Sequence, residues 1–344
     1  MFKKRIAVIG CGISSSAFYH FIDKNKFDII FFEKARGSGG RMSSRRIDEM
    51  FFDQGASCFG AIRSEKFNNF IAPFLEKGII KEWSGEFRIL DGKTMQYSDL
   101  AKKKRLVCRS QSNLLIKEII SSAIESGDIK FNKKVIEIIQ KGKKHCIATD
   151  DGNVYDDFDY VVSSAPAPQT LQIFPSNFCF TELLKAVKYN TTFVLMISLE
   201  KSKKIDFSHL AIRNSIISRI SYENSKGGER NFDKDCFVAN ANNVFSDAVC
   251  NMDYEIIKRD LLEEFLRIVD LDKGGVCDVV LHRWLYANSS HSYNYSALLD
   301  SDLNLAAIGD YVKEPRVEMA FESGAEMAET INYLNESDAK IKLG

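Results

Sequence analysis

The amino-acid sequence predicts an α/β protein, in which a Rossmann-like domain with a parallel sheet contains an inserted α+β domain with a mixed sheet. Three observations predict this fold. Residues 6–33 have the pattern of a strand, a glycine turn, a helix and a second strand, the unit that begins a doubly wound sheet. Two more apolar runs, at 159–162 and 304–308, are predicted to be strands of the same domain. The 344 residues suffice for roughly two domains.

The first of these stretches carries the pattern of a dinucleotide-binding site. The apolar run Ile6–Ile9 precedes a turn with Gly10 and Gly12, and the next apolar run, 28–32, ends at Glu33. Glycines let a pyrophosphate approach the helix N-terminus, and an acid about 20 residues further on binds ribose hydroxyls. The residues expected to contact the dinucleotide are Gly10, Gly12, Ile13, Ser14, Ser15 and Glu33, with Ser15 in place of the motif's third glycine.

A second glycine-rich loop, EKARGSGGRMSS at 33–44, follows directly. Arginine is the usual fork for phosphate, and glycine permits close backbone approach. The pattern E-x-x-R-x-x-G-G-R after a first βαβ unit resembles the FAD-binding half of the amine oxidase and carotenoid desaturase superfamily. This resemblance implies FAD, held non-covalently because the last cysteine is Cys277 and no cysteine lies near the C-terminus. The loop residues expected to bind FAD are Lys34, Arg36, Gly39, Gly40, Arg41 and Met42.

Composition argues against several classes of protein. The 47 Lys and Arg residues balance 47 Asp and Glu residues, so no global field favours nucleic acid or an anionic membrane. Eight scattered cysteines without a CxxC pair argue against a disulfide framework or a zinc site. No stretch approaches the roughly 18 apolar residues of a membrane span. The sequence therefore predicts a soluble cytoplasmic protein without a metal, nucleic-acid or membrane partner.

Longer blocks of sequence narrow the resemblance. They are KARGSGGRMSSRR (34–46), the FFDQG block (FFDQGASCFGA, 51–61), FVLMISLE (193–200), the SYENS block (IRNSIISRISYENSKGGER, 212–230), the HRWLYA block (282–287) and IGDYVKEPRVEMAFESGAEMAE (308–329). In this order, over nearly the whole chain, they resemble the renalase family, especially its bacterial members. The resemblance implies a p-hydroxybenzoate-hydroxylase-like fold and oxidation of the 2- and 6-dihydro isomers of NAD(P)H. Hydride would pass to flavin N5, and O2 would be reduced to hydrogen peroxide.

The C-terminal part is expected to complete the FAD site. The predicted strand at 304–308 ends in Gly309-Asp310, and a helical pattern runs from Val317 to Ile331. In glutathione-reductase-type flavoproteins such a Gly-Asp pair lies beside the ribityl chain or phosphate. The following helix there directs its positive end at the flavin pyrimidine. By analogy with related flavoproteins, Val135 is expected to offer backbone contacts to adenine.

Hydride transfer needs no protein nucleophile, so no catalytic residue is assigned. The candidates for the substrate site are instead residues that would line the substrate pocket. The candidates are His282, Arg283, Trp284, Tyr286, Tyr222, Asn224, Ser57 and Cys58. Arg283 would pair with a phosphate or the carboxamide region, and Trp284 and Tyr286 would be flat walls. The alternative for the HRWLYA block is a core strand with a buried Trp and a hydrogen-bonded His, and for Tyr222 and Asn224 a simple loop.

The FFDQG block departs from the family pattern, which reads close to D-x-GAQYF. Here Ser57 and Cys58 replace the Gln-Tyr pair, and their smaller side chains would enlarge or re-aim the pocket.

The expected FAD-binding domain comprises 1–60, 105–166 and 301–344, and the expected substrate domain 61–104 and 167–300. A hairpin is predicted over 146–155, a strand over 193–199 and a helix over 260–269. The expected partners are a dihydronicotinamide and O2, and an oligomer is possible. Two alternatives stay open: oxidation of an amine or another small donor, and a flavin-binding regulatory protein with little turnover.

Overall fold

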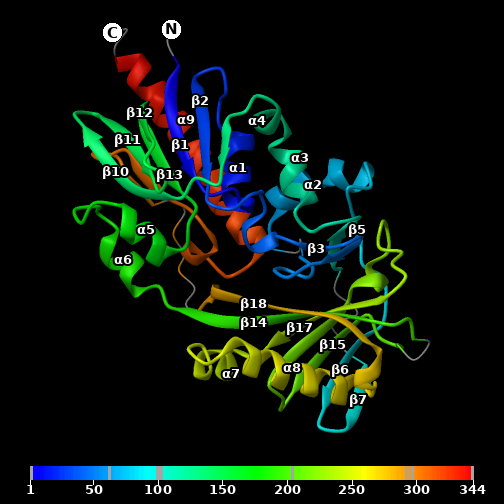
Figure 1. Ribbon diagram of the computed structural model, residues 1–344. Helices are drawn as coiled ribbons and strands as arrows, with labels where there is room; N and C mark the ends of the chain where they lie inside the picture. Colours follow the sequence, from blue (N-terminus) through cyan, green and yellow to red (C-terminus); the bar gives the residue numbers. More distant parts are fainter. Residues whose placement is uncertain are drawn as a thin grey trace. The chain divides into compact units, whose positions relative to one another are not determined.

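The chain divides between two structural units, each built from several segments (Figure 1). The computed structural model describes residues 3–60, 63–97, 104–202, 205–290, 293, 295 and 298–341. The first unit comprises Met1–Gly40, Ile116–Lys188 and Ser289–Gly344, and the second comprises Arg41–Leu115 and Tyr189–Asn288.

A six-stranded sheet in the order β19-β20-β13-β1-β2-β9 forms the centre of the first unit. Neighbouring strands pair in parallel except β19 with β20. The strands are β1 (Lys4–Ile9), β2 (Phe27–Glu33), β9 (Ile129–Phe131), β13 (Tyr160–Ser163), β19 (Leu298–Asp300) and β20 (Leu305–Ala307). The predicted strands near 6–9, 28–32, 159–162 and 304–308 all belong to this sheet, so the predicted Rossmann-like architecture is confirmed.

Two helices of the first unit pack against each other, α1 (Ile13–Phe21) and α9 (Val317–Ile341). The α9 helix continues beyond its predicted end at Ile331 into a polar stretch that carries no apolar periodicity. A separate antiparallel sheet contains β10 (Val135–Lys141), β11 (Lys144–Thr149) and β12 (Val154–Phe158), which confirms the predicted hairpin. The shorter helices are α3 (Leu114–Ile119), α4 (Ser121–Glu125), α5 (Ala167–Ile173) and α6 (Thr181–Ala186).

The second unit is built on a seven-stranded sheet in the order β18-β14-β17-β16-β15-β6-β7. Its strands are β6 (Phe87–Asp91), β7 (Thr94–Tyr97), β14 (Tyr189–Leu199), β15 (His209–Arg213), β16 (Ile217–Tyr222), β17 (Asp235–Ala241) and β18 (Val276–Ser289). Because β15 pairs in parallel with β6 and antiparallel with β16, the sheet is mixed, as predicted.

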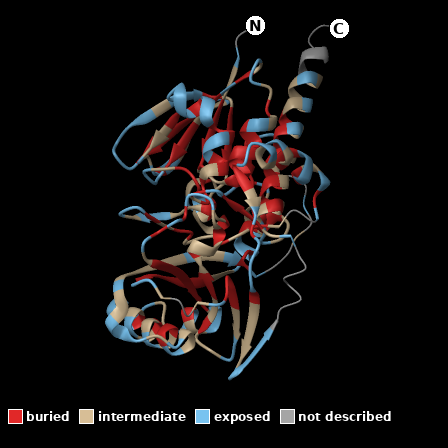
Figure 2. Cartoon of the chain, turned by 90° about the vertical axis from the view of Figure 1, so that its right-hand side faces the viewer, coloured by how far each residue is buried: buried red, intermediate tan, exposed pale blue. Residues whose placement is uncertain are grey.

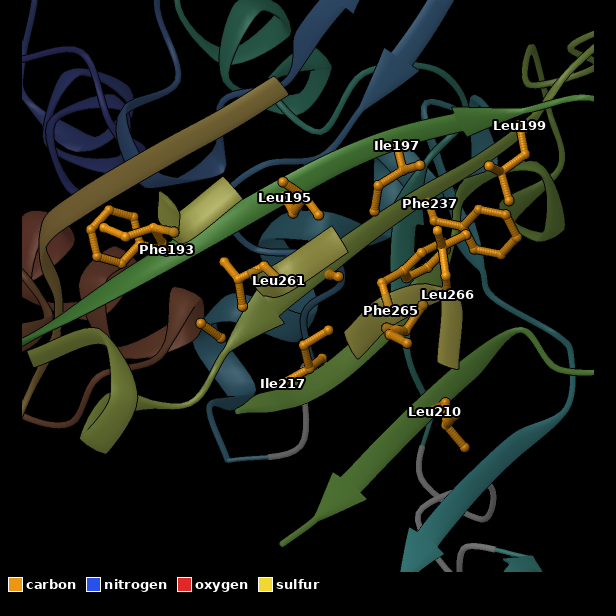
Figure 3. Packing of buried hydrophobic residues seen from close by; sticks show 14 of the residues in the cluster. Phe193, Leu195, Ile197, Leu199, Leu210, Ile217, Phe237, Leu261, Phe265 and Leu266 are labelled. Atoms are coloured by element: carbon orange, nitrogen blue, oxygen red, sulfur yellow. The ribbon is translucent and has the colours of Figure 1, made fainter. Parts of the chain in front are cut away.

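Each face of this sheet is covered by a different set of elements. On one face α7 (Asn243–Ala248) and α8 (Tyr254–Val269) enclose an apolar core of the unit. Figure 3 shows Leu261 and Phe265 of α8 packed towards Leu195 and Phe237 of the sheet. On the other face the hairpin of β3 (Arg45–Ile47) and β4 (Met50–Phe52) packs against β14 and β17. The unit also contains α2 (Glu65–Glu76), β5 (Ile80–Glu82) and β8 (Leu106–Cys108).

Buried residues follow most strands of the two large sheets, whereas exposed residues lie mainly on loops and outer helix faces (Figure 2). Within the part of the chain that is described, no helix is long and apolar enough to cross a membrane.

The unit boundaries differ from the expected domain boundaries. Residues 41–60 and 105–115 pack in the second unit, and residues 167–188 and 289–300 pack in the first. The physical reason for the first shift is that Met50 and Phe52 belong to the apolar core beneath β14 and β17. Parts of the expected domains, at 1–2, 61–62, 98–103, 203–204, 291–292, 294, 296–297 and 342–344, lie outside the described residues. The division into an FAD-binding and a substrate domain stays a prediction.

Candidate functional site

The glycine turn between β1 and α1 requires glycine at its first position. Gly10 has φ +94°, and a Cβ there would lie 2.6 Å from the Ser164 hydroxyl oxygen. Gly12 is the N-cap of α1, and a Cβ there would meet nothing within 4 Å. Because Gly12 has no side chain to cap the helix, the first-turn N–H groups are available to an anion.

Glu33 lies at the end of β2 and holds the turn in place. Its carboxylate is buried, with Oε2 accepting the Cys11 N–H and Oε1 accepting the Ala35 N–H, both at 2.8 Å. Burial raises the pKa of Glu33, and these backbone hydrogen bonds counter the shift. Each carboxylate oxygen keeps a further acceptor position, so the group can still accept a hydrogen bond from a ribose hydroxyl.

The second glycine loop lies against the first. The Gly39 N–H donates to the Cys11 carbonyl at 2.8 Å. Gly40 has φ +53°, and a Cβ there would come within 3.3 Å of the Gly12 Cα. The two loops therefore form one cradle, lined by Gly10, Gly12, Gly39 and Gly40, into which these positions project no side chain. Lys34 and Arg36 lie exposed on its rim.

The other residues expected at the cofactor lie in both units. Gly309 has φ +153° and donates its N–H to the Ser323 hydroxyl at 3.0 Å, and Asp310 beside it is buried. The segment leading to Val135 lies beside β2, since the Lys133 N–H donates to the Glu33 carbonyl at 2.9 Å. Ile13, Ser14 and Ser15 are buried in the first turn of α1, and Val317 begins α9. Arg41 and Met42 belong to the second unit, where Arg41 donates to the Ala287 carbonyl at 3.0 Å.

The HRWLYA block divides between the two faces of β18. Trp284 donates its indole N–H to the Gln54 carbonyl at 2.8 Å, and the His282 ring meets it edge-on with centroids 4.6 Å apart. Burial and the charge of Arg45 lower the pKa of His282. Arg283 instead contacts the α8 side, donating to the Cys250 carbonyl at 2.7 Å. The structure thus brings together His282 and Trp284 but not Arg283.

The remaining substrate-site candidates have structural partners. Tyr286 meets Tyr189 edge-on, with ring centroids 5.4 Å apart. Tyr222 donates its hydroxyl to Asp235 at 2.6 Å, and Asn224 connects its turn to β17 through the Cys236 N–H at 2.8 Å.

The two residues that depart from the family pattern differ in their surroundings. Ser57 is buried. Cys58 packs against Trp83, Phe87 and Val107, and the Arg105 guanidinium lies 3.5 Å from its sulfur.

The sequence matches the family of flavin containing amine oxidoreductases over residues 64–332, and an NAD(P)-binding Rossmann-like domain over residues 8–74. The chain belongs to the flavin-containing amine oxidoreductase family. FAD is accordingly its cofactor. The glycine cradle and the buried Glu33 fit a dinucleotide of this kind, because they offer backbone N–H groups and a carboxylate without intruding side chains.

Solved structures share the fold of this amine oxidoreductase at low identity. A protein from Exiguobacterium sp. 255-15, provisionally named protoporphyrinogen oxidase, has a TM-score of 0.76 at 13% identity, over 97% of this chain and 99% of that one. Cyclohexylamine oxidase from Brevibacterium oxydans IH-35A has a TM-score of 0.73 at 10% identity, over 97% and 100%. Wild-type putrescine oxidase bound to putrescine has a TM-score of 0.70 at 12% identity, over 96% and 99%. These similarities show the fold alone.

Sequence reasoning missed a buried ion network in the second unit of this family member. Asp53 Oδ2 lies 2.8 Å from Lys226 Nζ and 2.7 Å from Arg230 Nη2, and Glu223 pairs with the same two cations at 2.7 and 2.6 Å. All four side chains are buried. The network connects the FFDQG block to the SYENS block. The only sign of this network in the sequence was that both blocks contain charged residues. Among the described residues, no group of His, Cys, Asp or Glu is arranged to hold a metal ion.

Proposed function

We propose that this amine oxidoreductase is an FAD-dependent oxidase of the renalase type. Its substrates are the 2- and 6-dihydro isomers of NAD(P)H, which carry the transferable hydride at C2 or C6 of the pyridine ring instead of C4. Bound FAD would supply the hydride acceptor, and NAD(P)+ would leave. The two electrons and the proton of that hydride, with one further proton, then reduce O2 to hydrogen peroxide. The proposal includes a cytoplasmic location, which the cysteine pattern favours.

The observation that carries this proposal is the meeting of three sequence blocks that bear the resemblance. Asp53 of the FFDQG block pairs with Arg230 of the SYENS block, and Gln54 accepts the indole N–H of Trp284 in the HRWLYA block. These blocks are far apart in sequence and build one region of the second unit. We expect blocks that lie together in this way if they resemble those of the renalase family because they form the same substrate site.

The cradle of the first unit would hold the cofactor. Bound FAD supplies the hydride acceptor. The first-turn N–H groups of α1 would bind its pyrophosphate, and Glu33 would accept its ribose hydroxyls. Gly309 and Asp310 would lie along the ribityl chain or phosphate. The N-terminus of α9, at Val317, would favour negative charge on the reduced flavin.

Replacing Glu33 by alanine tests the ribose contact. We expect FAD affinity to fall about tenfold to a hundredfold, because a charge-assisted hydrogen bond contributes about 1.5–3 kcal/mol. Fluorescence titration of the apoprotein with FAD measures the change. Glu182→Ala is the matched control, because Glu182 pairs with Lys185 and is 86% exposed. Equal FAD affinity in both variants would contradict the role of Glu33.

Anaerobic stopped-flow absorbance tests the activity itself. The yellow protein is mixed separately with 2-dihydro-, 6-dihydro- and 4-dihydro-NAD(P). We expect the 2- or 6-isomer to bleach the flavin at least about a hundredfold faster than the 4-isomer. Such a ratio requires the activation free energies of the two reactions to differ by only about 2.7 kcal/mol. Admission of air should then give one hydrogen peroxide per NAD(P)+ formed. Bleaching by the 4-isomer alone would overturn the proposal.

Amine oxidation is the second candidate function. The family description and the similarity to putrescine oxidase and cyclohexylamine oxidase favour it. Flavin bleaching by putrescine or cyclohexylamine, with none by the dihydronicotinamide isomers, would establish this candidate. Bleaching by no donor while FAD stays bound would instead favour a flavin-binding regulatory protein.

A further inference from the structure

One face of the second unit's sheet carries two arginines that are not neutralised. Arg219 lies on β16, and Arg105 directly precedes β8. In the described part of the chain neither forms an ion pair, whereas Arg88, Arg213 and Arg230 each pair with a carboxylate. A partly desolvated guanidinium without an acid nearby is energetically costly, so it is well suited to bind an anion.

Strand register places these two arginines at the same patch of the face. Arg219 and Ser221 are two residues apart on β16, so their side chains lie on one face, and Ser221 pairs with His209 of β15. His209 in turn pairs with Phe87 of β6. The Arg105 guanidinium carbon lies over the Phe87 ring, 4.8 Å from its centroid. Arg219 is thus a diagonal neighbour of His209, and Arg105 lies over the residue beside His209.

Buried polar atoms without hydrogen-bond partners surround this patch. Asn240 of β17 pairs in register with Arg219, and its Oδ1 has no partner among the described residues. The same holds for the Ser221 hydroxyl and for the Nε atoms of Arg105 and Arg219. Asn240 is 2% exposed and Ser221 is fully buried. Because buried polar groups are nearly always hydrogen-bonded, several unpartnered atoms in one place indicate a missing ligand.

No nearby group cancels the charge of the two arginines. Burial, together with the charges of Arg105 and Arg219, lowers the pKa of His209 to about 3, so His209 is neutral at physiological pH. The buried acids of the unit already have cationic partners, because Asp53 and Glu223 pair with Lys226 and Arg230, and Asp235 pairs with Lys201 at 3.7 Å. The patch is therefore positive overall and offers mainly hydrogen-bond donors.

We propose that Arg105, Arg219, Ser221 and Asn240, together the arginine patch, bind an oxyanion of the substrate. The inference rests on the proposed function, whose dinucleotide substrates carry a pyrophosphate. Guanidinium N–H groups and the Ser221 hydroxyl would donate to its oxygens, and the Asn240 amide would donate through its nitrogen after rotation of the side chain. A diamine would be repelled by the same two charges, so the patch selects against cationic substrates.

Calorimetric titration of the FAD-loaded protein with inorganic pyrophosphate tests this proposal. FAD fills its own cradle, so pyrophosphate reports on a second site. We expect Arg105→Gln and Arg219→Gln each to weaken pyrophosphate binding about tenfold to a hundredfold. Arg219→Lys should bind more tightly than Arg219→Gln because it keeps the charge. Arg213→Gln is the matched control, because Arg213 is 63% exposed and pairs with Asp91 on the same sheet. Retention of FAD and of the melting temperature shows that each variant is folded.

Succinate and putrescine complete the test. Tighter binding of succinate than of pyrophosphate would assign the patch to a carboxylate substrate, whereas the reverse would assign it to a phosphate. Putrescine should not compete with either anion. The proposal is overturned if all variants bind pyrophosphate equally, or if putrescine competes in the wild type.

The outcomes for the arginine patch and for the proposed function are separable. Arginine-dependent pyrophosphate binding without flavin reduction by the dihydro isomers would keep the patch and reject the activity. Fast reduction by those isomers with unchanged kinetics in both Gln variants would keep the activity and reject the patch.

Discussion

Replacing Asp53 by asparagine is expected to lower the free energy of unfolding by about 3–5 kcal/mol, because it leaves one positive charge of the buried network uncompensated. Asp53 Oδ2 is bound by Lys226 Nζ and Arg230 Nη2 at 2.8 and 2.7 Å, and its Oδ1 accepts from the Ser44 hydroxyl at 2.6 Å. In Asp53→Asn, Glu223 alone would face two buried positive charges. Urea unfolding followed by circular dichroism measures the difference.

A matched control separates burial from charge. Glu49→Gln also removes a carboxylate that pairs with an arginine, but Glu49 is 90% exposed. We expect this variant to change the free energy of unfolding by less than about 1 kcal/mol, as is usual for surface ion pairs. If Asp53→Asn were no more destabilising than Glu49→Gln, the network would contribute specificity without stability.

The same network predicts how the effect of Asp53→Asn depends on pH. Burial alone would raise the pKa of Asp53, but the charges of Arg230 and Lys226 and the hydrogen bonds outweigh it and hold the pKa below its ordinary value of 3.8. A depressed carboxyl pKa stabilises the folded state above the unfolded value, and this contribution disappears as the pH falls through the folded value. The difference between wild type and Asp53→Asn should therefore be constant near neutrality and shrink below about pH 4.

The parts of the fold that could be predicted are those governed by local periodicity. The strand–turn–helix–strand segment from Ile6 to Glu33 could be predicted because apolar residues recur at different spacings in strands and in helices, and because the turn requires glycine. The contact between the loops of Gly39 and Cys11 could also be predicted, because both loops were expected to bind the same pyrophosphate. Each of these features depends on neighbours within about one supersecondary unit.

The ion network and the arginine patch could not be predicted in the same way. Asp53 and Arg230 are separated by 177 positions, and no local pattern shows that two charged residues will be buried together. Arg105 ends a run of basic residues that reads as a solvated turn. The separation of Arg283 from Trp284, by contrast, was available from the sequence, since adjacent residues of a strand point to opposite faces.

Replacing Gly324 by alanine is expected to disturb both stability and FAD binding. A Cβ at this position of α9 would lie 1.8 Å from the Ser14 carbonyl oxygen and 3.1 Å from the Phe18 nitrogen, both in the backbone of α1. A helix backbone cannot rotate away as a side chain can, so the two helices must move apart. Overpacking of this kind costs about 1–3 kcal/mol and occasionally more. We expect Gly324→Ala to lower the free energy of unfolding by about 3 kcal/mol, and thermal unfolding measures this loss.

The consequence for FAD follows from the place of Ser14 in α1. Ser14 lies in the first turn, whose N–H groups we propose as the pyrophosphate site, so a displaced α1 should weaken FAD binding as well as the fold. Gly274→Ala is the control, because a Cβ there meets nothing within 4 Å. A Gly324→Ala protein that unfolds earlier yet binds FAD as tightly as Gly274→Ala would show that α1 can shift without changing the cradle. Loss of both properties together would mean that the close packing of α9 on α1 fixes the position of the pyrophosphate site.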